Sequence, residues 1–186
     1  MSAPTHFNPL LRVLHWLMAM LLLAMLFIGV SMVGDLSPRH SVLIAVHKPL
    51  GLALLVLVLI RLAVRLARPV PALPADMPNW QQKVAKLSHL LLYALMLALP
   101  LVGWAMQSAG GYPLALHDSL LLPPIVSQDA QLYALLRLAH TVLAYLLFIS
   151  ILAHLAAALY HALIRRDGVL SSMTTGSGIR PTPDGQ

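Results

Sequence analysis

The stretch LYALLRLAHTVLAYLLFISILAHLAAALYHALI, residues 132–164, contains one charged side chain, Arg137, and two histidines that matter for function, His140 and His154. About 20 apolar residues in a helix cross the hydrocarbon layer of a membrane. His154 lies 14 positions beyond His140, which corresponds to about 21 Å along a helix and nearly four whole turns. The stretch therefore predicts a transmembrane helix whose two imidazoles point the same way at two depths.

Three further apolar runs, residues 10–33, 40–60 and 84–106, are also long enough to span a bilayer. They are continuously apolar and rich in Leu and Ala, which excludes the alternating pattern of a β-barrel. The chain is 59% hydrophobic and 10% charged, with a mean hydropathy of +0.82, so it is not an ordinary water-soluble domain. We expect an all-α integral membrane protein, a four-helix bundle over residues 1–170, with a disordered tail over residues 171–186 rich in Ser, Thr, Gly and Pro.

The charges predict the orientation of these helices. The net charge of +6 comes from 12 Lys or Arg and six Asp, and it is scattered among apolar runs, which argues against nucleic-acid binding. Basic residues gather between the second and third runs and after the fourth, at Arg61, Arg65, Arg68, Lys83, Lys86, Arg165, Arg166 and Arg180. The loop over residues 107–131 has Asp118 and Asp129 and no Lys or Arg, and its middle is a candidate for a short surface helix. The positive-inside rule then predicts that both termini are cytoplasmic.

Histidines inside membrane helices are functional candidates because an unpartnered imidazole is costly there. In this topology His15 lies at the depth of His154, and His47 lies at the depth of His140. Each pair suits one six-coordinate b-type haem, with the iron held by His15 and His154 near the inner face and by His47 and His140 near the outer face. One turn after each histidine is a small residue that leaves room for a macrocycle: Ala19, Gly51, Ala144 and Ala158. The alternative is that these histidines only form hydrogen bonds across helices.

Cysteine is absent, which excludes disulfides, thiolate zinc sites, iron–sulfur clusters and covalent haem attachment. The order and spacing of the remaining motifs resemble the bacterial cytochrome b561 family over residues 10–173, and within it the superoxide oxidases. The motifs are Arg12-x-x-His15-Trp16, His47-Lys48-Pro49-Leu50-Gly51, Lys86-Leu87-Ser88-His89 with Tyr93, Leu99-Pro100-x-x-Gly103, and His140 with His154-Leu155-Ala156-Ala157-Ala158 and His161.

The resemblance implies a multi-pass protein of the bacterial inner membrane with two haem b groups held by the same four histidines. It also implies electron exchange with ubiquinone, with superoxide as the donor on the outer side. Related di-haem subunits instead serve a periplasmic or dehydrogenase partner, and the shared motifs do not separate the two uses. A bis-histidine iron has no open position, so either use is electron transfer at the haem edge.

Basic and aromatic residues complete the candidate sites. Arg39, Lys48 and Arg137 are the cations available to guide superoxide to the outer haem, although Asp35, Asp118 and Asp129 balance them in net count. Lys48 and Arg137 also suit the propionates of the outer haem, and Arg12 those of the inner haem, with snorkelling to the interface as the alternative. For the quinone head group we expect the inner cluster of Lys83, Lys86, His89, His161 and Trp80.

Two readings without redox chemistry compete with this one. A proton channel or transporter would use the helical histidines as a relay, but no carboxylate lies between their two layers. A structural anchor for a soluble partner would leave the four layered histidines unexplained. A visible haem colour distinguishes the cytochrome from both.

Overall fold

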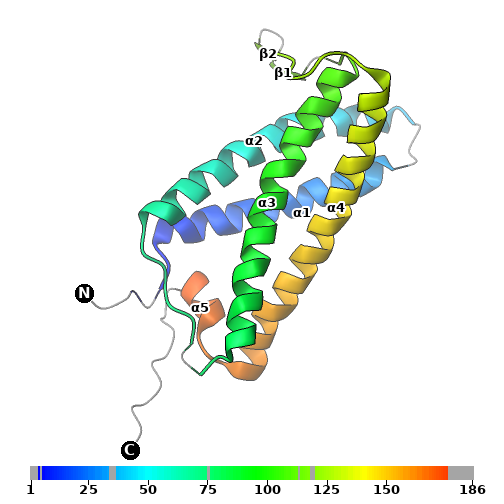
Figure 1. Ribbon diagram of the computed structural model, residues 1–186. Coiled ribbons are helices and arrows are strands. Elements are labelled where there is room, and N and C mark those ends of the chain that lie inside the picture. The colour runs from blue at the N-terminus through cyan, green and yellow to red at the C-terminus, as the bar shows by residue number, and fades with distance from the viewer. Residues whose placement is uncertain are drawn as a thin grey trace, which may run out of the picture. The chain divides into compact units, whose positions relative to one another are not determined.

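Four long helices make up most of the chain (Figure 1). The computed structural model describes residues 4, 6–33, 37–74, 76–112, 114–117 and 120–175. Asp35, Asp118, Arg180 and residues 176–186 lie outside this part of the chain. The four helices are α1 (Pro9–Met32), α2 (Arg39–Ala67), α3 (Asn79–Ala109) and α4 (Ala130–Leu159). The predicted four-helix membrane fold is confirmed.

The surface of these helices is that of a membrane protein. Each of the four is long and apolar enough to cross a bilayer, and no more than 17% of any span is buried inside the protein. Large apolar side chains face outward along their whole length; Phe27, for example, is 72% exposed and Ile164 is 71% exposed. A soluble protein rarely leaves so much contiguous apolar surface uncovered, so these faces are suited to lipid.

The end of α2 and the start of α3 extend further than hydropathy alone predicted. α2 continues seven residues beyond the expected end at residue 60, so Arg61 and Arg65 are helical, and α3 begins at Asn79 rather than at residue 84. The thickness of the hydrocarbon layer fixes only the minimum length of a span. The actual ends fall at prolines, because Pro69 follows α2 closely and Pro78 immediately precedes α3.

The expectation of a surface helix in the loop between α3 and α4 is wrong. The loop contains an antiparallel hairpin of β1 (Leu114–His117) and β2 (Leu120–Leu122). Prolines flank the short apolar strands at positions 113, 123 and 124, which disfavours a helix there. The loop is tied to α3, since the Trp104 indole donates to the Pro123 carbonyl at 3.1 Å and the Ile125 amide donates to the Ser108 hydroxyl at 3.2 Å.

The segment that follows α4 differs from the disordered tail that was expected from residue 171 onward. α4 passes into a π-helical turn, Tyr160–Arg165, and the chain then reverses through Arg166 and Gly168, which both have positive φ. A short helix, α5 (Val169–Met173), follows, and its Ser172 is almost fully buried at 1% exposure. Residues 171–173, which were expected to be disordered, therefore belong to a folded helix.

The chain divides into two compact units, and each long helix contributes to both. The first, here called the His140 unit, comprises Met18–Leu59 and Tyr93–Phe148. The second, the His154 unit, comprises Met1–Leu17, Ile60–Leu92 and Ile149–Gln186. Each unit contains two of the four predicted haem ligands, and each is described separately below.

Candidate functional site

In the His140 unit, α2 and α4 bring His47 and His140 together. Their ring centres are 6.2 Å apart and the ring planes make an angle of 67°. The His140 ring lies against the backbone of α3 at Gly103, where an added Cβ would be 3.4 Å from its Cε1 atom. The neighbouring core is apolar and includes the buried side chains of Leu95, Leu99 and Leu147.

In the His154 unit, α1 and α4 bring His15 and His154 together in the same way. Their ring centres are 6.3 Å apart with an interplanar angle of 47°. Two more aromatic rings adjoin this pair, because the Trp16 ring lies 5.3 Å from that of His15 and the His89 ring lies 5.4 Å from that of His154. The histidines paired by helix depth therefore lie close together in both units, and in the His154 unit the His89 ring is nearer still to His154 than the His15 ring is.

The two separations suit a metal held between opposed imidazoles. Metal–imidazole bonds of about 2.0–2.1 Å, with ring nitrogens about 1.1 Å from the ring centre, place two such rings roughly 6.2–6.4 Å apart. A porphyrin supplies the other four ligands, so two histidines complete a six-coordinate iron. Within the described part of the chain, Nδ1 of His15 and Nδ1 of His47 are among the buried ring nitrogens without a hydrogen-bond partner, so at least one imidazole in each pair is able to interact with a group from outside the chain. The residues present fit bis-histidine haem.

The two glycines of the motifs have different surroundings. Gly51 on α2, expected to make room for the outer haem, has the terminal methyl group of Met25 3.5 Å from the position of an added Cβ. Gly103 on α3 is the one that contacts a predicted ligand, His140. Gly103 belongs to the Leu99-Pro100-x-x-Gly103 motif and its contact with His140 was not predicted, although a glycine within an apolar helix indicates close approach of another group.

The basic residues near the two histidine pairs differ in their solvent exposure and in their contacts. Lys48 follows His47 on α2 and is half-buried, while Arg39 and Arg137 are exposed. Arg12, expected to bind a propionate of the inner haem, donates from one guanidinium nitrogen to the carbonyl of Thr174, and its role toward a propionate stays a prediction. Arg12 therefore ties the chain beyond α5 to α1.

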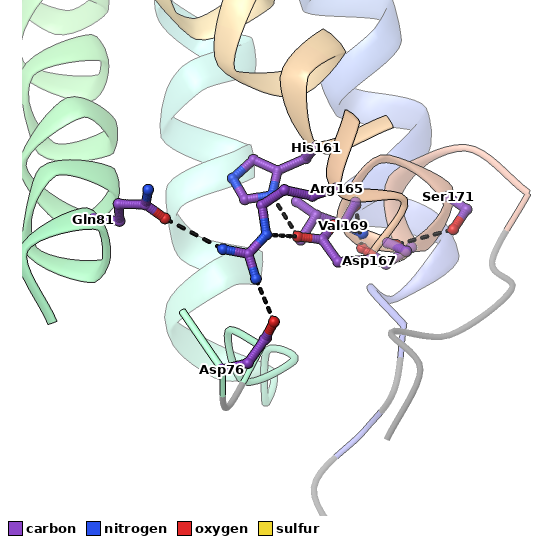
Figure 2. A network of polar contacts seen from close by, with 9 residues as sticks. Asp76, Gln81, His161, Arg165, Asp167, Val169 and Ser171 are labelled. Carbon is purple, nitrogen blue, oxygen red and sulfur yellow. Dashed lines mark hydrogen bonds and ion pairs between the residues drawn. The ribbon is translucent and has the colours of Figure 1, made fainter. Parts of the chain in front are cut away.

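A polar network that the sequence analysis did not anticipate lies where α4 ends (Figure 2). The Asp167 carboxylate accepts from Nδ1 of His161 at 2.6 Å and forms an ion pair with Nε of Arg165 at 3.2 Å. Arg165 also contacts Asp76 in the linker at 2.5 Å and Gln81 on α3 at 3.4 Å. Hydropathy gives no signal for the contacts of Arg165 with Asp76 and Gln81, because they join segments more than 80 residues apart in the sequence.

This network places the predicted quinone residues in three different settings. His161 is bound to Asp167, and His89 adjoins His154. Trp80, Lys83 and Lys86 are exposed on the first turns of α3, the helix that contacts Arg165 through Gln81. The π-helical turn that carries His161 and the helix that carries the other four residues meet at Arg165, and a shared quinone site stays a prediction.

A cavity of about 370 Å³ in the His140 unit lies where α3 ends and α4 begins. Tyr112, Tyr133, Gln128 and Asp129 are among its lining residues, and Asp129 also accepts from the Leu132 amide at the start of α4. No Lys, Arg or His is among the described residues that line it. The cavity is therefore unsuited to an anion.

The sequence of this chain is similar to those of known proteins over most of its length. The sequence model of the prokaryotic cytochrome b561 family matches residues 6–176. The chain belongs to this family. Cytochrome b561 homolog 1 of Escherichia coli (strain K12) is 29% identical to it over 86% of the chain and 92% of that protein. Probable superoxide oxidase CybB of Yersinia pestis is 27% identical over 86% and 90%, and cytochrome b561 homolog 2 of E. coli is 25% identical over 92% and 93%.

Membership of the cytochrome b561 family establishes the general class of the protein. It is a multi-pass electron-transfer protein of the bacterial inner membrane, and its family implies a b-type haem and a quinone or other redox partner. Its outward-facing apolar surface is in contact with lipid.

Proposed function

We propose that this cytochrome b561 carries two b-type haems, oxidises superoxide to dioxygen on the outer side and reduces ubiquinone on the inner side. The observation that carries the proposal is the pair of imidazole separations, 6.2 Å for His47 and His140 and 6.3 Å for His15 and His154. Both distances suit opposed ligands on one iron. The similarity to a protein named as a probable superoxide oxidase supports the choice of donor.

The reaction is balanced by two one-electron donors and one two-electron acceptor. Two superoxide anions lose one electron each and leave as dioxygen, and ubiquinone gains two electrons and two protons to become ubiquinol. When bound, the haems supply one-electron transfer between the two sides. Each histidine pair would hold the iron of one haem from both sides, and its two imidazoles would keep superoxide and quinone from binding the iron.

On the outer side, the chain would contribute attraction for an anion. Lys48 is adjacent to His47, and Arg137 is one helical turn before His140, so both cations are close to a proposed ligand in sequence. Arg39 begins α2 and is exposed. Attraction by such residues raises the encounter rate of an anionic substrate and weakens as the ionic strength increases.

On the inner side, the chain would contribute protons and a binding place for the quinone. We assign the head group to the region of His161, His89, Lys83, Lys86 and Trp80. Because Asp167 accepts from Nδ1 of His161, the Nε2 atom is the nitrogen of His161 left to face a quinone oxygen. A histidine held in this way can deliver a proton to the reduced quinone and be reprotonated from the cytoplasm.

The first test is a count of haem in the detergent-purified protein by reduced-minus-oxidised and pyridine haemochrome spectra. We expect two b-type haems per chain, reduction of both by a superoxide-generating system, and formation of ubiquinol from a soluble ubiquinone analogue. Lys48→Gln and Arg137→Gln are expected to lower the second-order rate constant for superoxide and to flatten its salt dependence, with the haem content unchanged.

Other outcomes of this test separate the alternatives. Two haems that superoxide does not reduce would favour an electron-transfer subunit that serves a periplasmic or dehydrogenase partner. A colourless protein that does not take up added haem would contradict the proposal and favour a histidine relay for protons.

A further inference from the structure

The short helix α5 in the His154 unit is held by donors from the start of the chain. The carbonyls of three consecutive residues at its end accept hydrogen bonds: Ser172 from the Phe7 amide at 3.4 Å, Met173 from the Trp16 indole at 3.1 Å, and Thr174 from the Arg12 guanidinium. The last carbonyls of a helix have no partners within it, so donors from another segment stabilise that end. Residues near the two ends of the chain are thereby joined.

This attachment reaches a proposed haem ligand through Trp16. The Trp16 ring packs edge-on against the His15 ring, with centres 5.3 Å apart and an interplanar angle of 78°. Trp16 is 44% exposed, and the hydrogen bond from its indole to Met173 gives the ring a fixed direction at the surface. The burial of Ser172 at 1% exposure indicates that α5 is docked rather than loosely attached.

We propose that Trp16 is a positioning residue for His15, and that α5 holds Trp16 in place and so sets the angle between the His15 and His154 rings. The inference rests on the proposed ligation of the inner haem by these two histidines. The present angle is 47°, against 67° for His47 and His140. Orientation of a ligating imidazole by its neighbours tunes the electronic properties of the metal.

The decisive variant is Trp16→Phe, which keeps an aromatic ring and removes the indole N–H. Trp104→Phe is the matched control, because Trp104 donates the same kind of bond at the same 3.1 Å, to Pro123 in the His140 unit. The readouts are the low-spin electron paramagnetic resonance signals of the oxidised haems, which respond to the angle between two axial imidazoles, and a spectroelectrochemical titration. The signals are assigned with His47→Ala. We expect Trp16→Phe to shift the inner signal and inner potential only, and Trp104→Phe to leave both inner values at wild type.

A pair of truncations tests the part played by α5. A chain ending at Gly168 lacks α5, and a chain ending at Thr175 retains it and all three acceptor carbonyls. We expect the shorter chain to reproduce the inner shift of Trp16→Phe and the longer one to match the full chain. If the shorter chain does not fold, Phe7→Pro, which removes the amide donor to Ser172, replaces it and is expected to shift the inner signal in the same direction.

These experiments separate failure of the positioning role of Trp16 from failure of the proposed function. If the wild-type protein does not give two bis-histidine signals, the proposed function is wrong. If it gives both and Trp16→Phe leaves the inner one unchanged, or moves the outer one equally, the positioning role is wrong. A shift with Trp16→Phe that removal or loosening of α5 does not reproduce would overturn the role of α5.

Discussion

The two histidine pairs have nearly the same ring separation and very different surroundings. In the His140 unit, the His140 ring rests on a helix backbone at Gly103 and the adjoining core is apolar. In the His154 unit, the pair adjoins Trp16 and His89, and the same unit contains the α5 attachment and the Arg165 network. Close approach of a helix backbone marks one pair, and the unit of the other contains hydrogen bonds and ion pairs between distant segments. The first should therefore be sensitive to side-chain volume and the second to polar substitutions.

The largest expected effect comes from removal of a ligand. His140→Ala and His154→Ala are each expected to lower the haem content from two to one per chain, measured by pyridine haemochrome, because an iron with one imidazole is held weakly. The remaining haem should keep the redox properties of the unit that is unchanged. His40→Ala, at the start of α2 and outside both pairs, serves as the control and should retain two haems. Retention of two haems in His140→Ala would contradict the assignment of the outer pair.

The next effect should appear only in the His140 unit. Gly103→Val directs a branched side chain against the His140 ring, where even a Cβ would be 3.4 Å from Cε1, so we expect reduced occupancy of the outer haem and a loss of about 1–3 kcal/mol in unfolding free energy. Gly29→Val on α1 is the matched control, since nothing lies within 4 Å of an added Cβ there. Haem spectra measure the occupancy of the outer haem in each variant, and thermal unfolding measures the stability. Equal losses in the two variants would mean that valine disturbs the helices generally.

The difference between the units also explains what the sequence could predict. Helix existence and the pairing of His15 with His154 and of His47 with His140 follow from hydropathy and from the period of an α-helix, and both are present in the structure. These are properties of single helices, which a sequence records locally. The ends of the helices were harder to predict from the sequence. The charges of Arg61 and Arg65 indicated a loop, whereas both residues lie in α2.

Features that depend on distant segments were not predicted. The bond between Arg165 and Asp76 joins residues 89 positions apart, and that between Trp16 and Met173 joins residues 157 positions apart. Arg12 illustrates the consequence, because its place near His15 suggested a haem propionate and gave no sign that its guanidinium also donates to Thr174. Local sequence patterns show which residues are polar at the end of a helix, and tertiary structure decides their partners.

A smaller effect is expected in the His154 unit when Asp167 is changed. Asp167→Ala removes the acceptor of His161 and Arg165 and the contact of its Oδ1 atom with the Val169 amide, and its side chain is only 10% exposed. Loss of a part-buried acceptor destabilises by roughly 1–3 kcal/mol, which thermal unfolding at constant haem content would measure. Asp167→Asn, which keeps an acceptor oxygen, should lose less. We expect ubiquinol formation to fall in both variants and the haem count to stay at two; a fall in the haem count would make Asp167 a structural residue of the inner haem pocket.

The smallest expected effect separates the two acidic partners of Arg165. Asp76 contacts Arg165 at 2.5 Å, closer than the 3.2 Å of Asp167, but the Asp76 side chain is 56% exposed. Solvent screens an exposed ion pair, so Asp76→Ala should lower the unfolding free energy by less than about 1 kcal/mol, and added salt should remove the difference from wild type. Thermal unfolding of both variants at low and high salt measures this. If Asp76→Ala were as damaging as Asp167→Ala at high salt, the linker would be a required part of the His154 unit, and burial would not be what ranks these two contacts.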